Sequence, residues 1–254
     1  MLLGLNGASI VRGLRFGPGE LVNACHRGVD VIRPMQGQVQ KQTGDALKSI
    51  PEISLDEILG EREAAVTVRV IKYEDGMMPS REAMALLAIL AAEHPKEVLE
   101  IGTYMGHTTR AMAENLPGSV IHTVDLPPDF ESRPVANGSP PKDDFHLIER
   151  RQVGREFNQR TFPAQIVQHF GDTATMDFQN LGKPTFFFID GSHTYEYCKQ
   201  DSEKCFALCG GKGTFLWHDC DEAHPGVIQF VLEWRALGRN IVRIRDTAIA
   251  YWKS

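Results

Sequence analysis

Short runs of β-branched and aromatic residues alternate with helical patterns from Lys96 to the end of the chain. This alternation is typical of a parallel sheet wrapped by helices. The run at 185–190 is apolar up to its final aspartate, as expected for a central strand that is buried on both faces. Other strands are predicted at 97–101, 120–125, 165–169, 213–218, 241–245 and 248–252.

The last two predicted strands are joined at Asp246 and Thr247, a connection too short for a parallel crossover. They should therefore form an antiparallel hairpin. Together with the five preceding strands, this predicts an α/β fold with a doubly wound, seven-stranded and mostly parallel sheet that ends in an antiparallel hairpin.

The rhythm of the chain changes near residue 75, which divides it into two predicted parts. Residues 1–75 are interpreted as an appendage or lid, and residues 76–254 as the domain that contains the sheet. An insertion at 126–160 interrupts this domain between two strands. Its proline-rich first part, 126–142, is predicted to be a loop, and its basic second part, 143–160, a helix.

Three further elements are predicted before the sheet. The pattern at 80–93 is that of a helix with Ser80 as its N-cap residue. Residues 55–59 predict a short helix. The alternation at 66–70 predicts a strand.

Composition excludes several classes of partner. The 254 residues contain 27 Lys plus Arg and 33 Asp plus Glu, a net charge of −6 without a long basic stretch. Sequence-independent binding to nucleic acid is therefore not expected. The longest apolar stretch, 83–92, is about half of what a membrane-spanning helix needs, and the first residues lack a signal-peptide pattern. Five cysteines, an odd number, do not indicate a disulfide framework, which predicts a cytoplasmic protein.

Acidic residues stand where the predicted strands end. In open α/β sheets, ligands bind outside the carboxyl ends of the strands. One or two such acids could cap helices, but a whole row of them favours a binding site. The residues at these ends are Glu100 with Gly102, Asp125, Asp172, Asp190, and His218 with Asp219.

The first turn after a strand, 100–109, reads E-I-G-T-Y-M-G-H-T-T. A dinucleotide fold needs G-x-G-x-x-G, because the second glycine lets the backbone approach the pyrophosphate. Tyr104 occupies that position, which argues against a diphosphate ligand. Asp125 follows at the spacing at which a carboxylate binds the ribose hydroxyls. The pattern predicts an adenosyl ligand without a phosphate, and a nicotinamide-dependent oxidoreductase is the weaker alternative.

Five ordered segments resemble a known superfamily. The segment V-L-E-I-G-T-Y-M-G-H-T-T-R-A-M-A, from Val98, resembles motif I of class I S-adenosylmethionine-dependent methyltransferases, in the branch of the catechol and caffeoyl-CoA O-methyltransferases. Later segments resemble a bacterial family that includes sugar O-methyltransferases of macrolide biosynthesis. They are V-G-R-E-F from Val153, H-F-G-D-T-A-T from His169, F-F-F-I-D-G-S-H-T-Y-E-Y from Phe186 and F-L-W-H-D-C from Phe215. The resemblance spans about residues 75–254 and implies a Rossmann-like methyltransferase fold.

The resemblance implies a role for each matching residue in binding S-adenosylmethionine. Asp125 would bind the ribose and Asp172 the adenine amino group, although Asp172 could instead cap a following helix. Asp190 would also lie at the cofactor. The residues that would hold the methionine part, or lie beside it, are Glu100, Gly102, Thr103, Tyr104, Gly106, Thr108 and Thr109.

The ends of the fourth and fifth predicted strands carry the candidate catalytic groups. In catechol-type relatives, an Asp and an Asp-Asn pair hold Mg²⁺, and a Lys three residues after the first Asp is the base. Here Asp190 and Asp219 match, Cys220 replaces the asparagine and His193 replaces the lysine. Mg²⁺ held by Asp190 and Asp219 and a metal-free site are both open interpretations. His193 is the expected general base, with His218 as its rival.

The sequence as a whole predicts a methyltransferase that transfers a methyl group from S-adenosylmethionine to an oxygen of a small-molecule acceptor. A nicotinamide-dependent oxidoreductase and a non-catalytic protein that binds an adenosyl ligand are the alternatives. Residues 1–75 and 126–160 are expected to shape the acceptor pocket or a contact in a homo-oligomer. The acceptor, the need for a metal and the oligomeric state are left open.

Overall fold

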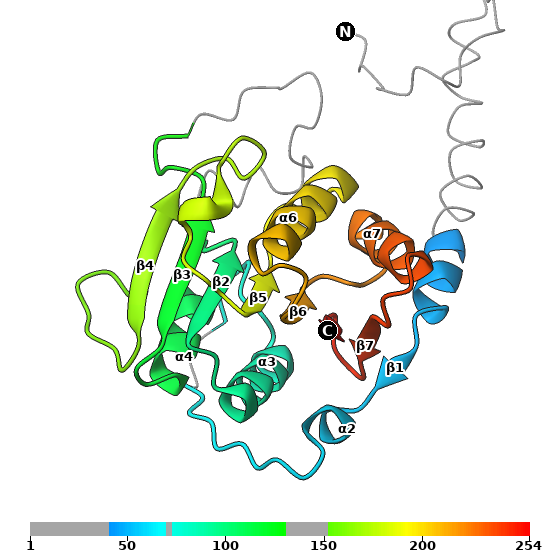
Figure 1. Ribbon diagram of the computed structural model, residues 1–254, viewed down its shortest axis with the longest axis horizontal. Coiled ribbons are helices and arrows are strands. Elements are labelled where there is room, and N and C mark those ends of the chain that lie inside the picture. The colour runs from blue at the N-terminus through cyan, green and yellow to red at the C-terminus, as the bar shows by residue number, and fades with distance from the viewer. Residues whose placement is uncertain (1–40, 70–72, 131–151) are drawn as a thin grey trace, which may run out of the picture. The chain divides into compact units, whose positions relative to one another are not determined.

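The computed structural model describes residues 41–69, 73–130 and 152–254 (Figure 1). The chain divides into two compact units, Met1–Gly44 and Asp45–Ser254. Of the first unit only residues 41–44 are described, and they are helical. Most of the predicted appendage, residues 1–75, lies outside the described residues, and the boundary at residue 75 stays a prediction. Everything below concerns the second unit.

The second unit is built on one eight-stranded sheet with the order β1-β7-β8-β6-β5-β2-β3-β4. β8 runs antiparallel to both of its neighbours, and the other ladders are parallel. The strands are β1 (Glu52–Ile53), β2 (Glu97–Ile101), β3 (Val120–Asp125), β4 (Gln165–Phe170), β5 (Phe186–Ile189), β6 (Thr214–Trp217), β7 (Val242–Ile244) and β8 (Ala250–Lys253). The predicted doubly wound sheet and its terminal hairpin are confirmed. β1, which pairs with β7, was not predicted.

Helices cover both faces of this sheet (Figure 1). The helices are α2 (Leu55–Leu59), α3 (Ser80–Glu93), α4 (His107–Asn115), the 3₁₀ turn η1 (Phe178–Asn180), α6 (Tyr195–Leu208) and α7 (Pro225–Ala236). Within the described residues, no helix combines the length and the apolar character needed to cross a membrane.

The central strand β5 supplies side chains to both apolar layers. Phe187 and Ile189 belong to the core on the side of α6 and α7, and Phe186 and Phe188 to the core on the side of α3 and α4. Successive side chains of a strand point to opposite faces, so an uninterrupted apolar run fits a strand that is covered twice. The prediction of a doubly buried strand at this position is confirmed.

The order of the sheet reverses between β2 and β5, because β3 and β4 lie on one side of β2, and β5 and β6 on the other. This is a topological switch point, where the loops leaving neighbouring strands diverge and open a crevice. The carboxyl ends of β2, β3, β5 and β6 meet along this edge, and the sequence places its acidic residues there.

Two predicted elements differ in the structure. Residues 66–69 form no strand, because the backbone of Thr67 bonds to the Asn115 side chain on α4: Thr67 N donates to Asn115 Oδ1 at 2.7 Å, and Asn115 Nδ2 donates to Thr67 O at 2.9 Å. Residues 152–160 form turns instead of the predicted helix. Their backbone is committed elsewhere, since Gly154 N donates to Tyr104 O at 3.0 Å. The rest of the predicted helix, 143–151, lies outside the described residues.

Helices α2 and α3 were both predicted, but the N-cap residue of α3 was predicted wrongly. The short helix α2 is confirmed, and its sequence signal is a capping box in which Ser54 and Glu57 each bond to the other's backbone. Helix α3 is also confirmed, but Ser80 is its first residue and not its N-cap. Pro79 is the N-cap and has no side-chain hydrogen bond to offer.

Candidate active site

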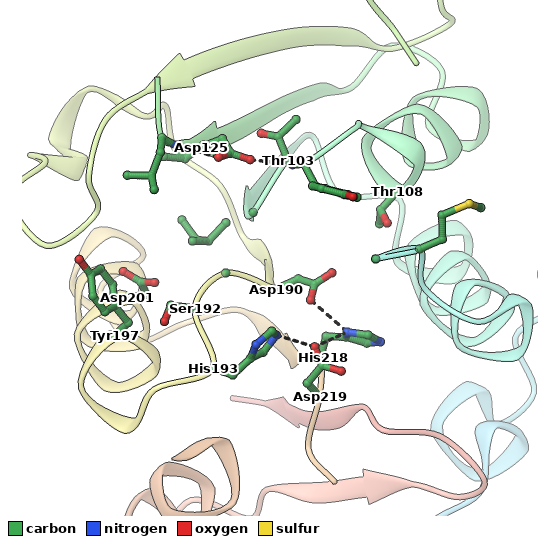
Figure 2. Close-up of a pocket in the computed structure, with 18 of the residues that line it drawn as sticks. Thr103, Thr108, Asp125, Asp190, Ser192, His193, Tyr197, Asp201, His218 and Asp219 are labelled. Atoms are coloured by element: carbon green, nitrogen blue, oxygen red, sulfur yellow. Dashed lines mark hydrogen bonds and ion pairs between the residues drawn. The ribbon is translucent and has the colours of Figure 1, made fainter. Parts of the chain in front are cut away.

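A cavity of about 570 Å³ opens at the switch point (Figure 2). The structure brings together there most of the residues that the sequence singles out. The predicted residues that line it are Gly102, Thr103, Tyr104, Gly106, Thr108, Asp125, Asp172, Asp190, His193, His218 and Asp219. The two that do not line it are Glu100 and Thr109.

The turn after β2 is pressed against the end of β5. Gly102 has φ +98°, and a Cβ atom at this position would lie 2.0 Å from the backbone oxygen of Asp190. Gly106 has φ +85°, and a Cβ there would lie 2.6 Å from the ring of Phe157. Only glycine combines the left-handed backbone with such close approach. The glycines of this turn therefore fix its distance from the neighbouring strand and from the segment at 152–160.

Asp125 is held rigidly at the end of β3. Its Oδ2 accepts a hydrogen bond from Tyr104 N at 2.6 Å, and its Oδ1 accepts one from Leu126 N at 2.7 Å. Tyr104 adopts φ +49°, which turns its N–H toward the carboxylate, while its hydroxyl donates to Asp75 O at 3.1 Å. A carboxylate oxygen can accept more than one hydrogen bond. These bonds therefore fix the orientation of the Asp125 carboxylate at the cavity.

Glu100 lies beneath the turn and not in the cavity. Its side chain is fully buried, and Oε2 accepts hydrogen bonds from Thr109 Oγ1 at 2.5 Å and from Thr123 Oγ1 at 2.6 Å. Burial raises the pKa of Glu100 to about 8, so the carboxyl group is largely protonated at neutral pH. Glu100 and Thr109 thus connect β2, β3 and α4 under the turn. Neither side chain lines the cavity, whereas the resemblance implies that both lie at the cofactor.

Asp172 lies at the part of the cavity formed by β4 and α6. Its Oδ1 accepts from Ala174 N at 2.8 Å and from Tyr197 Oη at 3.1 Å. No α-helix begins directly after it, so it caps a turn and not a helix. Asp201, one turn further along α6 than Tyr197, also lines the cavity, and burial raises its pKa to about 7. Sequence analysis missed both α6 residues, although their i, i+4 spacing places them on one helix face.

His218 bridges three carboxylates at the end of β6. Its Nε2 lies 2.7 Å from Glu82 Oε2, and its Nδ1 lies 3.0 Å from both Asp190 Oδ1 and Asp219 Oδ2. Burial disfavours the charged imidazole, but its bonds to these carboxylates outweigh burial and raise the pKa of His218 well above its usual value. A protonated imidazole cannot accept a proton, which argues against His218 as the base.

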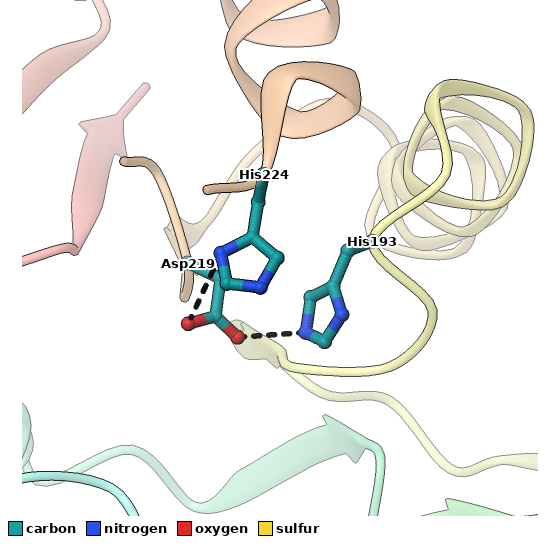
Figure 3. A group of neighbouring side chains, drawn as sticks. All are labelled: His193, Asp219 and His224. Atoms are coloured by element: carbon teal, nitrogen blue, oxygen red, sulfur yellow. Dashed lines mark ion pairs between the residues drawn. The ribbon is translucent and has the colours of Figure 1, made fainter. Parts of the chain in front are cut away.

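His193 follows β5 and faces Asp219. Its Nε2 lies 2.7 Å from Asp219 Oδ2 (Figure 3). Although burial alone would raise the pKa of Asp219, hydrogen bonds from His193 and His218 lower it below its usual range. The aspartate therefore remains a carboxylate that orients both imidazoles. Sequence analysis did not identify His224 as a site residue. Its ring packs at an angle on that of His193, with ring centroids 4.3 Å apart, and its Nδ1 lies 3.7 Å from Asp219 Oδ1.

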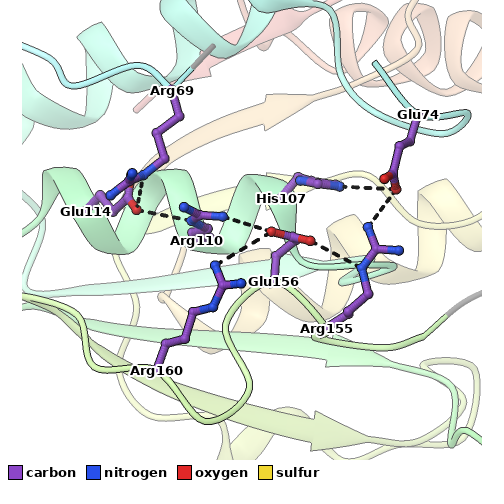
Figure 4. Close-up of polar contacts among 8 residues, drawn as sticks. All are labelled: Arg69, Glu74, His107, Arg110, Glu114, Arg155, Glu156 and Arg160. Atoms are coloured by element: carbon purple, nitrogen blue, oxygen red, sulfur yellow. Dashed lines mark hydrogen bonds and ion pairs between the residues drawn. The ribbon is translucent and has the colours of Figure 1, made fainter. Parts of the chain in front are cut away.

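A network of ion pairs ties two loops to the start of α4 (Figure 4). Arg155 Nη2 lies 2.6 Å from Glu74 Oε2, and Arg110 Nη1 lies 2.8 Å from Glu156 Oε2. These contacts hold the segment 152–160 beside the glycine turn 102–106. The other members of the network are Arg69, His107, Glu114 and Arg160. Arg155 and Arg160, which the sequence suggested as part of a basic helix, are thus engaged with Glu74 and Glu156.

Comparison with known families decides between the candidate classes. Residues 99–220 match a family model described as a methyltransferase domain. The chain carries a methyltransferase domain. The match runs from β2 through β6 and therefore contains Asp125, Asp190, His193 and Asp219. The predicted methyltransferase is confirmed, and a nicotinamide-dependent oxidoreductase is not favoured.

Several solved structures resemble this methyltransferase at low sequence identity. The SAH-bound methyltransferase PaMTH1 from Podospora anserina is 14% identical, with 71% of this chain and 81% of that chain covered and a TM-score of 0.47. The O-methyltransferase from Bacillus cereus in complex with SAH is 12% identical, with 85% and 91% covered and a TM-score of 0.44. TomG, an O-methyltransferase from Streptomyces achromogenes solved with SAM, is 13% identical, with 73% and 92% covered and a TM-score of 0.46. No curated protein sequence matches this chain.

Proposed function

We propose that this methyltransferase transfers the methyl group of S-adenosylmethionine to an oxygen atom of a small-molecule acceptor. One observation carries the proposal: a single cavity joins the fixed Asp125 carboxylate to the His193–Asp219 pair. The first suits an adenosyl ribose and the second suits proton removal from a hydroxyl group. Methyl transfer to oxygen needs both groups in one cavity, no further apart than a bound cofactor and its acceptor can span.

The cavity wall suits a cofactor that is cationic and carries no phosphate. Acidic side chains line it, among them Asp125, Asp172 and Asp190, and a sulfonium ion is attracted to them. Asp125 is the proposed partner of the ribose hydroxyls. Asp172, together with the Tyr197 hydroxyl that it accepts from, is the proposed contact of the adenine amino group. The glycine turn 102–106 would lie along the methionine part.

The chemical step needs alignment and a proton acceptor. The acceptor oxygen must approach the methyl group in line with the leaving sulfur, and its proton must depart as the new bond forms. His193 is the proposed acceptor of that proton. Asp219 holds the imidazole by its Nε2 at 2.7 Å and is suited to stabilise the imidazolium that results. The acceptor molecule itself is not identified by these groups.

Asp125→Ala is expected to weaken binding of S-adenosylhomocysteine by about 1.5–3 kcal/mol, because two charge-assisted hydrogen bonds to the ribose are lost. Titration calorimetry of the variant and of the wild type measures the difference. Asp125→Asn is the matched variant, since it keeps the shape and removes the charge. Unchanged affinity in both variants would place the ribose elsewhere. Binding of NAD, but not of S-adenosylhomocysteine, by the wild type would overturn the proposed cofactor.

Mg²⁺ held by Asp190 and Asp219 remains a prediction. The two oxygens are suitable ligands, and each lies 3.0 Å from His218 Nδ1, so this imidazole nitrogen lies within reach of an ion placed between them. Loss of turnover in EDTA and its recovery with Mg²⁺ is the result expected for a magnesium site. Full turnover in EDTA would remove the ion from the mechanism and leave His193 in place.

Several finer predictions stay open beside this core. The appendage and the insertion remain candidates for the acceptor pocket or for a contact in a homo-oligomer. A cytoplasmic location agrees with the free thiols at Cys198, Cys205, Cys209 and Cys220. A protein that binds S-adenosylhomocysteine but turns over no acceptor would fit the non-catalytic alternative.

A further inference from the structure

Three side chains from separate segments meet beside the cavity (Figure 3). His193 follows β5, Asp219 follows β6, and His224 is the N-cap residue of α7. One ligand atom from each, the two imidazole nitrogens and a carboxylate oxygen, lies within 4.8 Å of the other two. All three residues also line the cavity. The arrangement places the carboxylate between two imidazoles.

The backbone fixes this arrangement. A Cβ atom at Gly226 would lie 2.4 Å from the backbone oxygen of His193, so the start of α7 is pressed against the loop after β5. Asp219 adopts φ +56°, and Cys220 N donates to Ala248 O at 2.8 Å. These backbone contacts position the loop after β5, the loop after β6 and the start of α7 independently of the three side chains. The histidines are therefore brought together by packing of the fold and not only by attraction to Asp219.

We propose that His193, Asp219 and His224 bind a divalent transition-metal ion such as Zn²⁺ or Mn²⁺. Two imidazole nitrogens and one carboxylate form a ligand set that transition metals accept, whereas Mg²⁺ prefers oxygen ligands. This site differs from the predicted Asp190 and Asp219 pair in two of its three ligands. The other nearby imidazole, His218, is less suitable, because Glu82 and two aspartates contact both of its nitrogens, whereas the contacts of His224 with Asp219 and Asp221 both involve its Nδ1.

The ion would stand on the acceptor side of the cavity. Its binding does not depend on the proposed methyl transfer, but its effect on turnover rests on that function. With the ion bound, His193 would be a ligand, and the ion would lower the pKa of an acceptor hydroxyl bound to it, whose proton would pass to solvent water. Without the ion, His193 is available as the proton acceptor described above.

Direct titration tests the site without a known acceptor. The full-length protein is stripped with a chelator and titrated in a calorimeter with Zn²⁺, Mn²⁺ and Mg²⁺ separately. We expect Zn²⁺ or Mn²⁺ to bind at least tenfold more tightly than Mg²⁺. His193→Ala and His224→Ala should each weaken that binding at least tenfold. Asp190→Asn is the comparison for the neighbouring carboxylate, and His169→Ala removes a histidine of β4 that lies outside the cavity.

The outcomes separate this site from its alternatives. Loss of the ion in Asp190→Asn but not in His224→Ala would place it at the aspartate pair and overturn the proposal. Preference for Mg²⁺, absence of binding to any of the three ions, or equal loss in His169→Ala would also overturn it. Thermal unfolding of each variant identifies those that fail to fold, and for such a variant His224→Gln is measured instead. Titration of the stripped protein with S-adenosylhomocysteine tests the proposed function separately.

Discussion

His193→Ala is expected to lower turnover by about 10²–10⁴-fold, the usual worth of a positioned general base. The affinity for S-adenosylhomocysteine should remain nearly unchanged, because His193 lies away from Asp125, the proposed ribose contact, in the same cavity (Figure 2). The measurement is release of S-adenosylhomocysteine with an acceptor found by screening phenols and sugars. Calorimetry of the same variant supplies the cofactor affinity.

His224→Ala distinguishes two ways in which His193 can act. If His193 acts only as a base oriented by Asp219, loss of the second imidazole should change turnover little. If the three residues hold an ion, His224→Ala should lower turnover about as much as His193→Ala. His169→Ala is the matched control and should retain activity. Full activity in His193→Ala would contradict both roles.

Gly102→Ala is expected to lower the free energy of unfolding by about 2–6 kcal/mol and to abolish cofactor binding. Backbone strain at φ +98° contributes about 1–3 kcal/mol. A similar amount comes from overpacking, because the new Cβ would lie 2.0 Å from the backbone oxygen of Asp190. Relief of that contact would push the turn away from β5 and move Tyr104 N from Asp125.

The matched variant is Gly238→Ala. Gly238 has φ +89°, but a Cβ atom added there would have nothing within 4 Å, so this variant carries the backbone strain without the overlap. Chemical denaturation of both variants separates the two contributions. Equal losses of stability would mean that the close approach of the turn to β5 contributes nothing. Full cofactor affinity in Gly102→Ala would show that the turn does not hold the cofactor.

The sheet could be predicted because its signals are local. An apolar run such as 185–190 identifies a strand buried on both faces, and alternation with helical patterns implies a parallel order. The general rule that ligands bind at the carboxyl ends of strands then brought Asp125, Asp190 and Asp219 to one edge. The structure places all three in the same cavity.

The contacts that sequence analysis missed are those without a local signal. Glu82 lies 136 residues from His218 along the chain, and nothing in the helical pattern of α3 marks it as a partner of the active-site edge. His224 carries no local signal either, since it only precedes Pro225 at the start of α7. The role of Glu100 at the cofactor, which its position in motif I implies, stays a prediction, and the structure adds that Thr109 and Thr123 hold its side chain under the turn.

The bond between Glu82 and His218 bears on how much of the chain the proposed active site needs. The matched region, 99–220, contains His218 but not Glu82, which comes earlier on α3. It also lacks Ala248, whose backbone N–H donates to Glu82 Oε1 at 2.7 Å. A fragment cut to the matched region would leave His218 Nε2 without its carboxylate and would change the charge balance around Asp190. The contacts of the proposed active site therefore extend from α3 to the residues just before β8, beyond the region 99–220 that matches the family model.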